Sequence, residues 1–208
     1  CESGTPFHKI AVLYRQKEPY SSLVPTQLDL AGIPVSGPDP TALSSTPSGR
    51  LLLGMLSAMN SDLSRSEVLR WLSESPVRAG SDGQDSRGLF ADWEVLSRQA
   101  GIVKGIGQWE ERLAVLGTRL ARQIAVAAGL EETSEAKLEG LRRTSSAVDS
   151  LQRFIKDLSD RTSTHSGDTW DGLSRWIKRL LQHFAWHEND WPVEHMATHE
   201  RLLGILDE

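Results

Sequence analysis

Apolar residues recur three and four positions apart over most of this chain, and no other feature of the sequence constrains its fold as strongly. The pattern begins at Leu51 and continues to Leu206, with interruptions at short stretches rich in Gly, Pro and Ser. This spacing places apolar side chains on one face of a helix. It predicts helices over about 47–60, 65–75, 89–100, 109–128, 135–160, 170–184 and 193–206, and therefore a mainly α fold.

The segment from His8 to Val35 follows a different pattern. Ile10–Tyr14 is an apolar run with the composition of a buried strand, and Ile33–Val35 is a second extended run. A short helical pattern lies between them and ends at Gly32, in the manner of a glycine C-cap. Strand, helix and strand at this spacing predict a βαβ unit with two parallel strands. We therefore expect a small α/β piece in residues 1–36 and a multi-helix subdomain in residues 37–208.

Two strands do not form a stable sheet by themselves. We expect these two to join a larger parallel sheet outside this chain. The sequence also starts with Cys1 rather than methionine, and we interpret the chain as a piece of a longer protein.

Composition narrows the classes of partner. Of the 208 residues, 38% are hydrophobic and 25% are charged, which suits a soluble protein with an apolar core. No apolar run reaches the roughly 18–20 residues that a membrane helix needs, so we expect no membrane partner. The net charge is −5, whereas a chain that binds nucleic acid mainly through phosphates is usually basic. Any DNA contact of this chain alone is therefore expected to be local and weak.

The sequence lacks the catalytic motifs of ATP-dependent and nucleic-acid-cleaving enzymes. It contains no GxxxxGK[ST] phosphate loop and no Asp-Glu pair after an apolar strand that could hold magnesium. It also lacks the Asp…Glu-x-Lys arrangement with which nucleases bind metal ions for hydrolysis. We expect no catalytic residue and no cofactor in this chain.

Three stretches resemble a known family. IAVLYR, a helix and then AGIPV are similar to the opening of the second motor domain in superfamily 1 DNA helicases of the UvrD/RecB type. The following PTALSSTPSGRLLLGMLSAMNSDLSRSEVLRWLSESPVRAG resembles the all-helical 2B insertion of that family. WEVLSRQAGIVKGIGQWEERL is most similar to helicase–nuclease proteins of the AddB type and to actinobacterial relatives with a PD-(D/E)XK nuclease domain. The likeness is good over residues 6–112 and looser beyond.

The resemblance implies that residues 1–36 form the βαβ edge of a RecA-like 2A domain and that 37–208 form a 2B-like region. It implies a parent protein that is an ATP-dependent DNA helicase or exonuclease in recombination or repair, with ATP and Mg²⁺ bound outside this chain. The implied partners are DNA, the remaining domains of the parent chain and a partner helicase–nuclease subunit. The implied location is the bacterial cytoplasm, at the nucleoid.

Tyr14 and Arg15 are the first candidates for DNA contact. They stand where the first strand is expected to end, and α/β sheets bind ligands at the carboxyl ends of parallel strands. A tyrosine can stack on a base and an arginine can pair with a phosphate. The alternative is that Tyr14 belongs to the core and Arg15 pairs with a surface carboxylate.

Two glycine-containing turns supply the other candidates: Arg78 with Gly80, and Lys104 with Gly105 and Gly107. Glycine lets backbone amides approach a phosphate, and the start of a following helix adds a favourable dipole. UvrD-type proteins have a similar Gly-Ile-Gly turn in the helical insertion that meets duplex DNA. The alternative is that these glycines only cap and turn helices.

Two histidine pairs at helical spacing suggest a metal site: His183 with His187, and His195 with His199. Each pair would share one helix face, and two antiparallel helices could bring the four imidazoles together around zinc. The alternative, which we favour, is that they are polar surface or interhelical positions, because the HExxH order of metalloproteases is missing.

Two functions remain open at this point. The first is a non-catalytic part of a DNA helicase–nuclease that positions DNA and couples motor domains. The second is a helical protein-interaction scaffold of a repair complex with no DNA binding of its own. Salt-dependent DNA binding separates the two.

Overall fold

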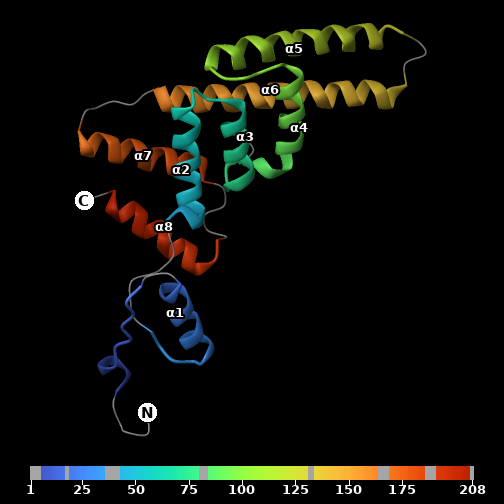
Figure 1. Cartoon of the computed structure of the whole chain (residues 1–208). Coiled ribbons are helices and arrows are strands. Elements are labelled where there is room, and N and C mark those ends of the chain that lie inside the picture. Colours follow the sequence, from blue (N-terminus) through green and yellow to red (C-terminus); the bar gives the residue numbers. More distant parts are fainter. Residues whose placement is uncertain are drawn as a thin grey trace. The chain divides into compact units, whose positions relative to one another are not determined.

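The computed structural model describes residues 6–16, 19–35, 43–79, 84–130, 134–163, 169–185 and 191–206. It divides the chain into two compact units, Cys1–Ala42 and Leu43–Glu208. The described residues are mainly α-helical (Figure 1), which confirms the predicted fold class.

The second unit carries the helices that the apolar spacing predicts. They are α2 (Pro47–Asn60), α3 (Arg65–Glu74), α4 (Ser86–Gln99), α5 (Ile106–Ala128), α6 (Glu135–Ser163), α7 (Trp170–Phe184) and α8 (Val193–Ile205). A short 3-10 helix, η2 (Leu43–Ser45), precedes α2. Two short strands, β1 (Arg78–Ala79) and β2 (Gln84–Asp85), form an antiparallel pair between α3 and α4.

Local sequence fixes where the first of these helices begin. The Thr46 side chain accepts a hydrogen bond from the Gly49 amide at 3.1 Å, and Pro47 occupies the first helical position, where an N–H has no helical partner anyway. Ser64 starts α3 by accepting from the Glu67 amide at 3.4 Å. Such caps satisfy amides that every helix start leaves open.

The helices of this unit share one hydrophobic core. Figure 1 shows α5 and α6 side by side as a long helical hairpin, while α4 packs on α6 and α2 packs on α3, α7 and α8. Aromatic rings from α3, α4, α6 and α7 meet at the centre. Ring centroids are 5.1 Å apart for Trp93 and Phe154 and 5.7 Å apart for Trp71 and Phe184. The Trp71 indole N–H donates to the Leu51 carbonyl at 2.9 Å, so its burial leaves no polar group unsatisfied.

The first unit contains η1 (Phe7–Lys9) and α1 (Tyr20–Leu30). The helix expected in this segment is present. It ends as predicted, because Gly32 has a φ of +67° and the Ile33 amide donates back to the Leu28 carbonyl at 2.9 Å.

The predicted βαβ unit is not formed by the described residues of the first unit. Neither Ile10–Tyr14 nor Ile33–Val35 is a strand. A strand needs a neighbouring backbone to complete its hydrogen bonds, and a parallel strand also needs cover on both faces. Both conditions are unmet here, since Leu13 is 93% exposed and Ser21 is the one buried residue among those described in this unit.

Candidate functional site

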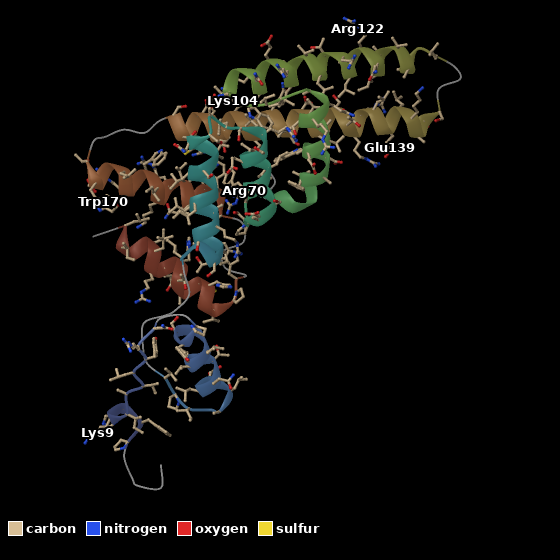
Figure 2. The ribbon with its side chains drawn as sticks, in the orientation of Figure 1. Lys9, Arg70, Lys104, Arg122, Glu139 and Trp170 are labelled. Atoms are coloured by element: carbon tan, nitrogen blue, oxygen red, sulfur yellow. The ribbon has the colours of Figure 1, made fainter. Side chains whose placement is uncertain are left out.

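The turn before α5 holds Lys104, with an exposed side chain (Figure 2). Gly105 is the N-cap of α5 and has a φ of +85°, a conformation that glycine adopts without strain. The chain itself uses several amides of this turn. The Gln108 side-chain oxygen accepts from the Val103 and Lys104 amides, at 3.1 and 3.4 Å, and the Gly105 amide donates to the Asp62 carbonyl at 2.6 Å.

A carboxylate lies beside this turn. Asp62 Oδ2 is 3.4 Å from the position that a Cβ on Gly105 would take. A carboxylate near a helix N-terminus is favoured by the same dipole that favours a phosphate. Asp62 therefore opposes an incoming phosphate at Gly105. Gly107 lies two residues further along the chain. It has open space around it, since an added Cβ there would meet nothing within 4 Å.

Arg78 lies in β1 and is exposed. It follows the C-terminal end of α3, whereas the Lys104 turn meets the N-terminal end of α3, where the Arg65 amide donates to the Val103 carbonyl at 2.9 Å. The 10 residues of α3 separate the two turns, a helix length of about 15 Å. The two predicted turns are therefore separate points and not one basic patch. Gly80 lies outside the described residues.

Tyr14 and Arg15 belong to the first unit, where both are exposed and the described residues before them, 6–13, form no strand. The Tyr14 ring lies 6.4 Å from the Tyr20 ring, centroid to centroid, at a tilt of 33°. Tyr14 is thus not a core residue, and its face has an aromatic neighbour.

The histidines have separate structural partners. His183 Nε2 lies 2.6 Å from Asp157 Oδ2 and links α7 to α6. His199 is buried in α8, with its Nδ1 2.8 Å from the Ser48 hydroxyl at the start of α2. His195 is half-buried, and His187 lies outside the described residues. Over the described ranges, no three His, Cys, Asp or Glu side chains are grouped so that they could hold a metal ion.

A pocket of about 290 Å³ with both polar and apolar lining residues lies between α2 and α3, and sequence reasoning missed it. We call it the α2–α3 pocket. Its lining comes from η2 (Ser44), from α2 (Arg50, Leu53, Gly54, Ser57) and from α3 with its C-cap (Arg70, Trp71, Glu74, Ser75). One signal was available in the sequence, because Arg50, Gly54 and Ser57 follow at helical spacing on a helix that is otherwise largely apolar.

Charged groups at this pocket hold one another in place. Ser57 donates to the Glu67 carboxylate at 2.7 Å, and Arg70 donates both to Glu67 and to the Ser57 hydroxyl. The Ser57 hydrogen bond and, after it, Arg70 lower the pKa of Glu67 below its ordinary value. Glu67 therefore stays ionised and keeps the Arg70 guanidinium oriented.

A second cavity, of about 260 Å³, lies between α5 and α6. Buried Trp109, Leu113 and Ile155 line its floor, and the exposed Arg153 and Lys156 lie at its rim. The ammonium group of Lys156 is already paired with Asp160, at 3.3 Å. This cavity is mainly apolar.

Comparison with known proteins finds no relative: no protein-family model, no curated protein and no solved structure matches this chain. Within the described ranges, none of the helices combines the length and the apolar character that crossing a bilayer requires.

Proposed function

We propose that this chain is a non-catalytic module of an ATP-dependent DNA helicase–nuclease of the UvrD/RecB type that acts in recombination or repair. Its first unit joins a larger α/β motor domain, and its helical unit positions DNA. ATP and Mg²⁺ are bound elsewhere in the parent protein. The proposed partners are DNA, the remaining domains of the parent chain and a partner helicase–nuclease subunit, in the bacterial cytoplasm at the nucleoid.

The observation that carries this proposal is the exposure of the apolar N-terminal run. Ile10, Val12 and Leu13 are 49%, 55% and 93% exposed. A contiguous apolar run of this kind marks a surface that another protein surface covers. A β-rich apolar sequence suits incorporation into a sheet, where a neighbouring strand would supply both hydrogen bonds and cover.

The DNA-positioning role depends on a few basic side chains. Arg78 and Lys104 are exposed and lie next to backbone turns that hold them at fixed points of the helical unit. They are separated by the length of α3, so each would meet a different phosphate. Binding by the chain alone is expected to be weak and steeply salt-dependent, because phosphate contacts release counterions and the net charge is −5.

Fluorescence anisotropy with labelled duplex and single-stranded oligonucleotides tests this role. The titration is run at several salt concentrations for the parent chain and for the double variant Arg78→Ala/Lys104→Ala. Losing two phosphate contacts should flatten the log–log salt slope on duplex DNA by about 1.8 and weaken binding equally for all sequences. The double variant Arg119→Ala/Arg122→Ala removes the same charge from the exposed side of α5 and should leave the slope unchanged. Equal losses for both double variants would mean that only overall charge matters.

Asp62 offers an independent arm of this test. If a phosphate approaches the start of α5, then Asp62→Asn should strengthen DNA binding, because the carboxylate beside Gly105 is gone. No gain in affinity would place DNA elsewhere on the molecule.

The second candidate function is a helical interaction scaffold with no DNA binding of its own. The carboxylate of Asp62 beside Gly105, and the separation of the two basic turns, are the observations that favour it. It is the better description if the unmodified chain shows no salt-dependent DNA affinity, while Leu13→Asp abolishes its association with the motor domain of the larger protein.

A further inference from the structure

Ser75 is buried, and no described residue supplies a hydrogen-bond partner for its hydroxyl. It is 4% exposed, and among the described residues its side chain makes no hydrogen bond, although its backbone N–H and C=O do. The other buried polar side chains in those ranges, such as Ser48, Ser97 and Ser174, have partners. Leaving a buried hydroxyl unsatisfied costs about 1–3 kcal/mol. Since such groups are rare in folded proteins, this one calls for an explanation.

Ser75 is a lining residue of the α2–α3 pocket, together with two arginines. Arg50 is held in place by the backbone, since its Nε donates to the Glu74 carbonyl at 3.0 Å and its Nη1 donates to the Ser45 carbonyl at 2.7 Å. These bonds use two of the five N–H donors of a guanidinium. Neither bond involves Nη2 of Arg50, so the arginine is fixed in position and keeps donors for a ligand.

Arg70 also lines the pocket. Its contacts with Glu67 and Ser57 involve Nη2 alone, which leaves donors on its Nε and Nη1. The pocket thus combines two oriented guanidinium groups with the hydroxyl of Ser75. Among the lining residues the carboxylate is that of Glu74, which is exposed, and the Glu67 carboxylate, outside the lining, already accepts from Ser57 and Arg70. Donors exceed acceptors, and this composition fits a ligand made of acceptors.

We propose that the α2–α3 pocket binds a phosphate group, with Arg50 and Arg70 as charged donors and Ser75 as a neutral donor. Guanidinium groups match the tetrahedral oxygens of phosphate through paired N–H donors. A volume of about 290 Å³ holds a phosphate with a small substituent. The phosphate is either free in solution or carried at the end of a nucleic-acid strand. The proposal does not rest on the function proposed above, because Arg78 and Lys104 lie outside this lining.

Inorganic phosphate is the probe for the first test. Isothermal titration and thermal melting of the whole chain are carried out with phosphate and, at equal ionic strength, with chloride. Ser75→Ala should weaken phosphate binding about tenfold, because a hydrogen bond to a charged group is lost. Without ligand, the melting temperature of this variant should equal or exceed that of the unmodified chain, since the substitution removes an unsatisfied buried group. A Ser75 that only supports the fold would instead give a lower melting temperature.

Two further variants complete the design. Glu74→Gln should strengthen phosphate binding, because it removes the carboxylate of the lining. Arg122→Ala, on the exposed side of α5, removes a positive charge outside the pocket and should bind phosphate like the parent chain. The proposal is overturned if phosphate and chloride act alike on the parent chain, or if Ser75→Ala and the parent bind phosphate equally.

The source of the phosphate is decided by competition. A single-stranded oligonucleotide with a 5′-phosphate and the same oligonucleotide without it are titrated into the chain with and without inorganic phosphate. A preference for the 5′-phosphorylated strand that inorganic phosphate and Ser75→Ala both remove assigns the pocket to strand ends. Binding of inorganic phosphate with no such preference assigns it to a free phosphate ligand.

Discussion

Gly105 and Gly107 lie two positions apart at the start of α5, and their backbone conformations differ. Gly105 has a φ of +85°, whereas Gly107 is helical and open space surrounds its Cα. Gly105→Ala should destabilise the fold by about 1–2 kcal/mol, since a Cβ is unfavourable in the left-handed region. Gly107→Ala should stabilise it by up to about 0.5–1 kcal/mol, because alanine loses less backbone freedom in a helix. Urea denaturation measures both.

Gly101 is the matched control for that pair. It also has a positive φ, of +68°, and ends α4, so Gly101→Ala should be destabilising to a similar degree. An unchanged free energy of unfolding for both Gly101→Ala and Gly105→Ala would contradict the positive φ angles in the segment between α4 and α5.

Glu67 gives a pH dependence with a definite sign. Its pKa is lowered in the folded chain by Ser57 and then by Arg70, so its contribution to stability is complete above the unfolded-state pKa of about 4.3 and is lost as the pH falls below it. Thermal melts of the parent chain and of Glu67→Gln should therefore diverge near neutral pH and converge in acid. Ser57→Ala, which removes the larger cause of the lowered pKa, should shrink the difference between them. If the melting temperatures of the two proteins differ by the same amount down to pH 3, the ionised Glu67 carboxylate is not the source of the difference.

At the scale of elements, Gly54 sets how closely α2 approaches α3. A Cβ at this position would lie 2.5 Å from Trp71 Cδ1, and the indole is fixed by its hydrogen bond to Leu51. Gly54→Ala should push the two helices apart and cost about 1–3 kcal/mol, as overpacking of a core does. Gly140→Ala, in α6, is the control, because a Cβ there meets nothing within 4 Å. It should instead stabilise the chain in the same urea titration.

The helices could be predicted from the sequence because their signals are local. Thr46, Ser64 and Gly105 mark helix starts through caps and turns that involve residues only a few positions away. The apolar spacing predicts a start of α4 at about 89, and the structure has it at Ser86. The strand expected at Ile10–Tyr14 is different in kind, because a strand depends on a neighbour that the local sequence does not specify.

The candidate site was predictable only in part, for the same reason. The Lys104 turn follows from its glycines, but the carboxylate of Asp62 reaches it from the end of α2 and has no sequence signature. The partners of His183 and His199 come from α6 and α2, so helical spacing suggested a metal site where the structure has two separate contacts. The Ser75 pocket likewise depends on two helices meeting.

For the whole molecule, the two units differ in what stabilises them. The described residues of the first unit contain one buried side chain, that of Ser21, whereas the second has a continuous core built from α2 to α8. A chain that begins at Leu43 should therefore keep its helical circular dichroism and melt within a few degrees of the full chain. Limited proteolysis of the full chain should cut first in residues 1–42 and leave the remainder intact. Unfolding of the shortened chain would show that the first unit completes the core.

The corner between α2 and α3 also bears on how the chain emerges during synthesis. Asp62 and Leu63 both have positive φ, of 57° and 48°, although neither is glycine. Their carbonyls accept hydrogen bonds from the Gly105 amide and from the Trp109 indole, and Trp109 lies 46 residues after Leu63. At a ribosomal rate of about 5–20 residues per second, the corner waits roughly 2–9 seconds for these partners. For most of that interval α2 and α3 have both been synthesised, but nothing from α5 yet holds the angle between them.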